Sequence, residues 1–311
     1  MFVEMSDADG EEAAADDVCA NCGKAAVDDV KLKICTACKL VKYCSVDCQK
    51  NHRPQHKKAC KKRALEIRGD KLFQQPDESH FGECPICCLP MPLDHNKWRM
   101  NSCCCKRICN GCYYANALRE KEQGLEQKCP YCREELPATK EDEVHQNYMK
   151  RAKANDPVAL CELGNRCDRE GNFEGAVEYW KKAAALGDIE SHQNLSLMYH
   201  EGQGVERDEK KKIYHAEEAA IGGHPRARNN LSVIEQNRGR HDRAMQHLII
   251  AAKQGFDDGL EAVKKGFSYG IVSKEDFEAA LRGHQAAVDA TKSEQREKAY
   301  DFYKRRARGF Y

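Results

Sequence analysis

Apolar residues recur with helical spacing in the second half of the chain. Leu160, Leu163 and Gly164 lie at i, i+3 and i+4, and after a glycine-bearing turn the stretch from Ala176 to Ala184 repeats that spacing. Each stretch is long enough for about three helical turns and has one apolar face. The pattern predicts a hairpin of two helices.

This hairpin pattern repeats along the chain. The pairs Ala183-Ala184, Ala219-Ala220 and Ala251-Ala252 are each followed by glycine three residues later, in steps of 36 and 32 residues. The longer step indicates a four-residue insertion in the Gly202–Val205 loop. A period of this length predicts an α-solenoid of stacked hairpins.

The solenoid is expected to span residues 156–288. A degenerate fourth unit runs from Asp257 to about Ala287, with a helix start at Ser273, and residues 289–311 form a charged C-terminal helix or cap. Trp180, Tyr214 and Leu248 are expected to fill the gaps between hairpins. Cys161 and Cys167 are interpreted as packing residues, because positions i and i+6 do not share a helix face.

One segment of this region carries a more specific signature. It reads Leu195-x3-Tyr199-x2-Gly202-x-Gly204-Val205-x2-Asp208, followed by Tyr214, the alanine pair and Gly223. The segment resembles the Sel1 repeat, a relative of the tetratricopeptide repeat. The resemblance implies a scaffold that binds other proteins.

The N-terminal third has a different composition. Of the 19 cysteines, 17 lie between Cys19 and Cys132. Residues 1–18 carry seven acidic groups and no Lys or Arg, which predicts an acidic disordered tail and no secretory signal. Paired cysteines in a chain without an export signal favour metal binding over disulfides. The same features predict a cytoplasmic or nuclear protein without a membrane span.

Residues 19–60 contain eight candidate metal ligands in four closely spaced pairs. C-x2-C pairs form tight turns, and a pair at i, i+4 occupies one face of a helix, so each pair supplies half of a tetrahedral site. Eight ligands suit two structural zinc ions with every position filled. The candidates are Cys19, Cys22, Cys35, Cys38, Cys44, Cys48, His56 and Cys60.

These residues closely resemble the MYND zinc finger. The resemblance implies interleaved pairs: one zinc on Cys19, Cys22, Cys44 and Cys48, the other on Cys35, Cys38, His56 and Cys60. His52 is the competing histidine and falls at a non-ligand position of the family pattern. Arg53 replaces the tryptophan of the family, and Pro54 is expected to interrupt the helix. A basic linker over 61–82 follows.

A second cysteine-rich set occupies residues 84–135. It consists of Cys84, Cys87, the run Cys103-Cys104-Cys105, then Cys109, Cys112, Cys129 and Cys132. The set resembles a RING finger, which implies two crossed zinc sites, the first on Cys84, Cys87, Cys109 and Cys112. Cys129 and Cys132 belong to the other site, whose remaining ligands come from the run. Lys106 occupies the usual histidine position and cannot be a ligand while charged, so Cys103 and Cys104 are favoured, with Cys105 as the substitute.

Many RING fingers are ubiquitin ligases that hold a ubiquitin-charged conjugating enzyme in a reactive arrangement. Ile86 matches the apolar contact to that enzyme in the family, and Arg133 matches the arginine that bridges enzyme and ubiquitin. Either residue has a purely structural alternative, because Ile86 can cover the zinc site and arginine often follows a C-x2-C pair.

Together these patterns predict a mainly α protein: two small zinc-stabilised modules followed by an α-solenoid of helical hairpin repeats. Four structural zinc ions are expected, two per finger. The leading hypothesis is a zinc-binding intracellular scaffold for protein partners, in which the RING-like finger recruits a ubiquitin-conjugating enzyme. The alternatives are a RING-type ubiquitin-protein ligase proper, with no catalytic residue of its own, and, ranked last, a nucleic-acid-associated regulator acting through the basic finger and linker. The net charge of +1 gives little support to that last reading.

Overall fold

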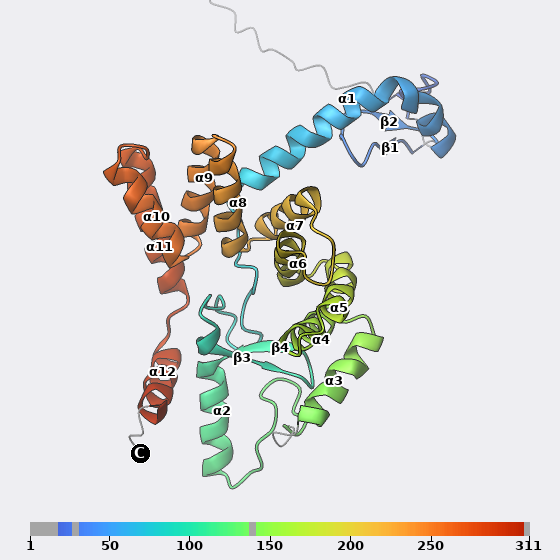
Figure 1. Ribbon diagram of the computed structural model, residues 1–311. Coiled ribbons are helices and arrows are strands. Elements are labelled where there is room, and N and C mark those ends of the chain that lie inside the picture. The colour runs from blue at the N-terminus through green and yellow to red at the C-terminus, as the bar shows by residue number, and fades with distance from the viewer. Residues whose placement is uncertain (1–17, 27–30, 137–140, 308–311) are drawn as a thin grey trace, which may run out of the picture. The chain divides into compact units, whose positions relative to one another are not determined.

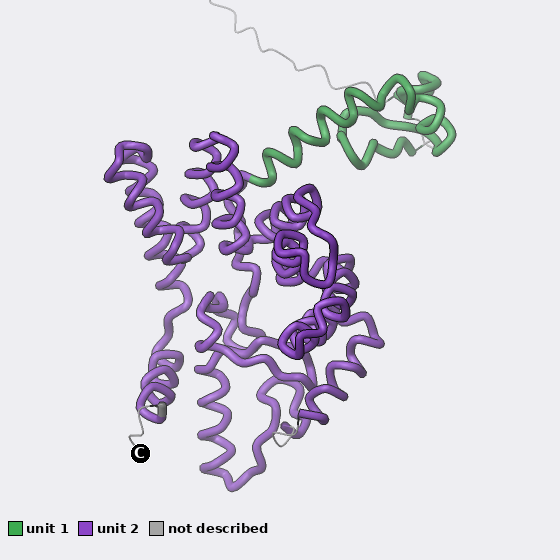
Figure 2. Tube along the Cα trace, viewed as in Figure 1, with its two compact units in different colours: residues 1–72 green, residues 73–311 purple. Residues whose placement is uncertain are grey.

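The computed structural model describes residues 18–26, 31–136 and 141–307 (Figure 1). The expected acidic tail lies almost entirely outside these residues, as does the end of the expected C-terminal cap. The chain divides into two compact units, residues 1–72 and 73–311 (Figure 2).

The first unit is a small hairpin followed by one long helix. Strands β1 (Lys33–Ile34) and β2 (Lys42–Tyr43) pair antiparallel, and helix α1 (Val46–Phe73) extends through the end of the unit. The expectation that Pro54 interrupts this helix was wrong. Proline removes one backbone N–H, and here the helix continues on both sides of it without a break.

The second unit begins with the other cysteine-rich module. After a short 3₁₀ turn (His95–Lys97), strand β3 (Trp98–Asn101) pairs antiparallel with β4 (Lys106–Cys109), and α2 (Asn110–Glu122) follows at once. Phe81, Met91 and Ile108 are buried among the cysteines and supply the apolar part of its core.

The rest of the second unit is helical. The helices, drawn in order along a curved row in Figure 1, are α3 (Glu141–Lys153), α4 (Pro157–Arg169), α5 (Phe173–Ala185), α6 (Ile189–Glu201), α7 (Glu209–Ile221), α8 (Pro225–Asn237), α9 (His241–Lys253), α10 (Asp257–Ser268), α11 (Lys274–Ala290) and α12 (Glu294–Ala307). Helices α4 to α11 form four antiparallel hairpins, as the repeat pattern predicts. The α6–α7 connection, residues 202–208, is four residues longer than the α4–α5 connection, residues 170–172, which places the insertion where it was expected.

Close packing within the first hairpin depends on a glycine. A methyl group on Gly164 would meet the Trp180 indole at 2.6 Å, so α4 can approach α5 only without a side chain at this position. Trp180 is 2% exposed and donates its Nε1–H to Asn165 Oδ1 at 3.1 Å. Leu248 is likewise buried, as predicted.

The prediction that Tyr214 fills the equivalent gap in the second hairpin was wrong, because its side chain is 48% exposed. Counting 36 residues from Trp180 gives Ala216, which is fully buried. Tyr214 precedes that position by two residues and therefore points to another side of α7.

Other sequence predictions for the repeats hold. Cys161 is buried in the core of the first hairpin and Cys167 packs against it. Ser273 begins α11, where its hydroxyl accepts a hydrogen bond from the Asp276 N–H at 3.0 Å. Among the described residues, no helix is long and apolar enough to cross a membrane.

Candidate zinc centres

The first finger brings its eight candidate ligands together in two interleaved groups. Cys19, Cys22, Cys44 and Cys48 form one group, in which the Cys22 and Cys44 sulfurs are 3.6 Å apart and those of Cys44 and Cys48 are 3.5 Å apart. Cys48 lies in the first turn of α1 and Cys44 directly after β2, so hairpin and helix each contribute to the group.

The second group of this finger combines three cysteines with a histidine. Cys35 and Cys60 sulfurs are 3.8 Å apart, and His56 Nε2 lies 3.2 Å from the Cys38 sulfur. His52 stays outside the group, as expected, because its Nδ1 is hydrogen-bonded to the Tyr43 hydroxyl at 3.0 Å. Its ring stacks on His56 and supports that ring from the side.

The first group of the second module joins the loop around Cys84 to the start of α2. The Cys84 and Cys112 sulfurs are 3.9 Å apart, and those of Cys87 and Cys109 are 3.8 Å apart. Cys109 is the N-cap of α2, and its sulfur accepts a hydrogen bond from the Cys112 N–H at 3.4 Å. This contact is typical of the support that zinc-bound thiolates receive.

The three consecutive cysteines separate in the structure. Cys103 and Cys104 approach Cys132 and Cys129, with sulfur separations of 3.4 and 3.8 Å. Cys105 has a positive φ of 53°, which turns its side chain away, and it packs against Tyr148 of α3. The structure thus groups Cys103 and Cys104, rather than Cys105, with Cys129 and Cys132, and zinc binding by this pair stays a prediction. Exposed Cys88 belongs to none of the groups found in the described residues.

The geometry of all four groups fits zinc. Zn–S bonds of about 2.3 Å in a tetrahedron imply sulfur–sulfur edges of about 3.8 Å, and the observed separations are close to that value. All 19 cysteines lie in the described part of the chain and are free thiols, so no disulfide competes for them. Each group offers four ligands, which leaves a tetrahedral ion without an open position.

The pKa values of several ligand thiols link metal binding to pH. Burial raises the pKa of the Cys104 thiol to about 12 and that of Cys60 to about 11. Hydrogen bonding with Cys48 raises the pKa of Cys44 to about 12. Zinc binds thiolates, so loading these groups must release protons.

Two further residues were predicted as a contact site for a conjugating enzyme. Ile86, between Cys84 and Cys87, is 41% exposed. Arg133 follows Cys132 at φ 65°, and its Nη1 donates to Asn116 Oδ1 at 2.9 Å and lies 3.6 Å from Glu120 Oε1. The Arg133 side chain is thus held against α2.

No pattern in the sequence points to a fifth cluster of candidate ligands, formed by His80, Glu190 and His224. His80 Nε2 lies 3.3 Å from one carboxylate oxygen of Glu190 in α6, and His224 Nε2 lies 3.5 Å from the other. These residues are 110 and 34 positions apart in sequence, and no local spacing connects them. The cluster joins the segment before Cys84 to the second and third repeats.

The tautomer of His224 argues against a metal ion in this cluster. Its Nδ1 accepts a hydrogen bond from the Ala227 N–H at the start of α8. In a neutral imidazole the proton must then lie on Nε2, which is 3.5 Å from Glu190 and has no lone pair for a metal. Burial lowers the pKa of His80 to about 4. Burial alone would raise the pKa of Glu190, but hydrogen bonds with His224 and His80 hold it well below its ordinary range. The cluster is a tie of close polar contacts between two parts of the second unit.

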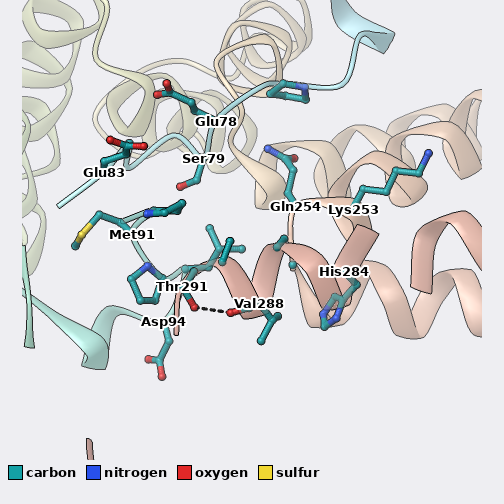
Figure 3. Close-up of a pocket in the computed structure, with 18 of the residues that line it drawn as sticks. Glu78, Ser79, Glu83, Met91, Asp94, Lys253, Gln254, His284, Val288 and Thr291 are labelled. Atoms are coloured by element: carbon teal, nitrogen blue, oxygen red, sulfur yellow. Dashed lines mark hydrogen bonds between the residues drawn. The ribbon is translucent and has the colours of Figure 1, made fainter. Parts of the chain in front are cut away.

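A cavity of about 470 Å³ lies between the segment before Cys84, the loop before β3, and helices α9 and α11 (Figure 3). Ser79, Gln254 and Thr291 line the cavity, whereas the Met91 side chain points away from its middle. The Asp94 carboxylate points away from it and instead caps the 3₁₀ turn by accepting from the Asn96 N–H. The lining also includes charged side chains, among them Glu78, Glu83 and Lys253.

Comparison with known families identifies two parts of the chain. The MYND finger matches residues 19–60, and the Sel1 repeat matches residues 157–188, 189–224 and 234–256. No curated protein matches the chain.

Two solved structures are similar in fold. A Sel1 repeat protein from Oxalobacter formigenes shares 21% identity over 57% of this chain and 69% of its own, with a TM-score of 0.40. The c5321 protein, a protective antigen of uropathogenic Escherichia coli strains with an SLR fold, shares 22% identity over 62% of this chain and 40% of its own, with a TM-score of 0.38. The chain thus joins a MYND zinc finger and a second cysteine-rich, zinc-type module to Sel1 repeats, and MYND fingers and Sel1 repeats are protein-interaction modules.

Proposed function

We propose that the protein is a zinc-dependent interaction scaffold in which the Sel1 repeats select a protein partner and the second zinc-type module recruits a ubiquitin-conjugating enzyme. The observation that carries the proposal is the completeness of the four ligand groups. Four protein ligands around each ion make the zinc structural and leave no position for a reacting water. Association with other proteins is then the activity that the modules support.

Exposure of Ile86 supports the recruitment of a conjugating enzyme. An isoleucine with 41% of its surface open, on a loop held by two ligands of one group, offers a rigid apolar contact. The loop cannot yield without disturbing Cys84 or Cys87. A partner would therefore meet a preformed surface.

The position of Arg133 favours recruitment of a conjugating enzyme over rapid transfer of ubiquitin from it. A bridging arginine must donate to enzyme and ubiquitin together, and here its Nη1 is engaged by Asn116. Release of that bond would precede any bridging role. The alternative, a ligase proper, is supported by the half-exposed Arg133 side chain, whose other guanidinium nitrogens remain available for a second partner.

One paired experiment distinguishes the scaffold from the ubiquitin ligase. The zinc-loaded full chain is titrated with a panel of conjugating enzymes to measure binding, and the same enzymes, charged with ubiquitin, are assayed for discharge. The scaffold predicts binding that Ile86→Ala abolishes and Arg133→Ala leaves unchanged, with little discharge. Strong discharge lost in both variants would establish the ligase, and absence of binding across the panel would refute the recruitment claim. Leu118→Ala, at a similarly exposed apolar residue on α2, is the matched control.

A further inference from the structure

The last helix of the chain lies against the second zinc-type module. Helix α12 packs alongside α2, where Tyr114 meets Phe302 with ring centres 4.8 Å apart (Figure 1). Gln295 donates to the Gly111 carbonyl at 3.1 Å. Gly111 has no room for a side chain, because an added methyl would lie 3.0 Å from the Arg296 Cα. The two helices are therefore in direct backbone contact beside Cys109 and Cys112.

Arg296 extends from this contact into the loop that follows Cys87. Its Nη1 donates to the Pro90 carbonyl at 2.7 Å and to the Thr291 carbonyl at 2.8 Å. Its Nη2 donates to the Leu89 carbonyl at 3.1 Å and to the Cys87 sulfur at 3.4 Å. One guanidinium thus joins α12, the zinc loop and a ligand sulfur that is 209 residues away in sequence.

The positive charge of the Arg296 guanidinium suits its position beside a zinc–thiolate group. Four thiolates around one Zn²⁺ carry a net charge of about −2, which a neighbouring cation stabilises. Arginine can donate to several acceptors in one plane, whereas lysine offers a single point charge. Ion pairs in the described part of the chain give Arg296 no carboxylate partner, so the sulfur is its anionic contact.

We propose that α12 is a latch on the Cys84–Cys87–Cys109–Cys112 group, with Arg296 as the outer cation of its zinc–thiolate centre. Zinc at this group and docking of α12 then stabilise each other, since linkage between two binding events is reciprocal. Loss of zinc from the group releases the helix and uncovers the Tyr114 face of α2. The inference depends on zinc at this group and is independent of any role in ubiquitin transfer.

The first test measures cysteine reactivity in the zinc-loaded full chain. Each cysteine is followed by mass spectrometry during alkylation with N-ethylmaleimide, which attacks thiolates. Arg296→Met should make Cys87 react severalfold faster, while Cys35 in the first finger reacts at an unchanged rate. Arg305→Met, at an exposed arginine on the same helix, is the matched control and should leave Cys87 unchanged. An unchanged Cys87 rate in Arg296→Met would overturn the proposal.

The second test disrupts the zinc group and measures the effect on the docking of α12. Cys84→Ser removes one ligand, and hydrogen exchange then reports on α12. The latch predicts that the amides of residues 297–307 lose protection while α4–α9 keep theirs. A chain ending at Ser293, which lacks the helix altogether, should show the same rise in Cys87 reactivity as Arg296→Met. Full protection of α12 in Cys84→Ser, or unchanged Cys87 reactivity in the shortened chain, would contradict the linkage.

Discussion

Arg133 donates a hydrogen bond from Nη1 to Asn116 Oδ1 at 2.9 Å, and this bond fixes the residue after the last zinc ligand onto α2. Arg119 donates to the same oxygen at 3.0 Å, so Asn116 is the common acceptor for two arginines. Any transfer role of Arg133 must compete with this arrangement.

Removing the acceptor should therefore loosen Arg133, which then keeps its contact with Glu120. We expect Asn116→Ala to raise ubiquitin discharge from a recruited enzyme severalfold, because a single neutral acceptor contributes about 1 kcal/mol. The measurement is single-turnover discharge with each variant. Arg119→Ala serves as the control, since it leaves the Arg133 bond intact. Equal discharge by wild type and Asn116→Ala would show that the hydrogen bond to Asn116 does not limit the role of Arg133 in ubiquitin transfer.

Zinc removal should act on the two cysteine-rich modules before the repeats. Their cores consist largely of ligand cysteines, whereas the hairpins bury Trp180, Leu195 and Leu248 independently of any ligand. Chelation should abolish the protease resistance of residues 19–132 and keep most of the far-ultraviolet helical signal. Resistance that survives complete chelation would contradict a structural role for the metal.

Close packing in the first hairpin predicts a large effect from a small substitution. Gly164→Ala places a methyl group 2.6 Å from the Trp180 indole, and overpacking of this kind costs about 1–3 kcal/mol. We expect a lower urea midpoint for unfolding of the repeats. Arg169→Ala, at the exposed end of the same helix, should change the midpoint little. A stability equal to wild type would mean that α4 and α5 do not approach as described.

The tie between His80 and Glu190 predicts a pH dependence of stability. Folded His80 has a pKa of about 4, against 6.5 for the free group, so between these values the unfolded chain binds more protons. Stability must then fall as pH falls through this window, by at most about 1.4 kcal/mol per pH unit for one group. His80→Asn retains a donor for Glu190 without titrating.

Urea unfolding at pH 7.0 and 5.5 measures this contribution. His80→Asn should lose less stability than wild type between pH 7.0 and pH 5.5. The contributions of the other titrating groups cancel in the difference between the two proteins. The same loss in both proteins would show that His80 does not titrate as described.

Local patterns were enough to predict much of this protein from its sequence. Ligand pairs such as Cys19–Cys22 lie within one turn, and the alanine–glycine period marks each hairpin, so both follow from neighbouring residues. The docking of Arg296 on Cys87 and of His80 on Glu190 could not be predicted, because each depends on how distant elements meet. The predictions for Pro54 and Tyr214 were wrong for local reasons. The helix around Pro54 tolerates one missing backbone N–H. Tyr214 lies two residues from the buried position of α7, which moves its side chain off the buried face.

The number of zinc ions bound per chain tests the four closed ligand groups. Native mass spectrometry of the full chain should show four zinc ions and no mass deficit from disulfides. Cys104→Ser should lower the count to three, whereas Cys105→Ser, at the neighbouring thiol that packs against Tyr148, should keep four. A wild-type chain that binds fewer than four zinc ions, or a Cys105→Ser chain that loses one, would contradict the four closed centres on which the account depends.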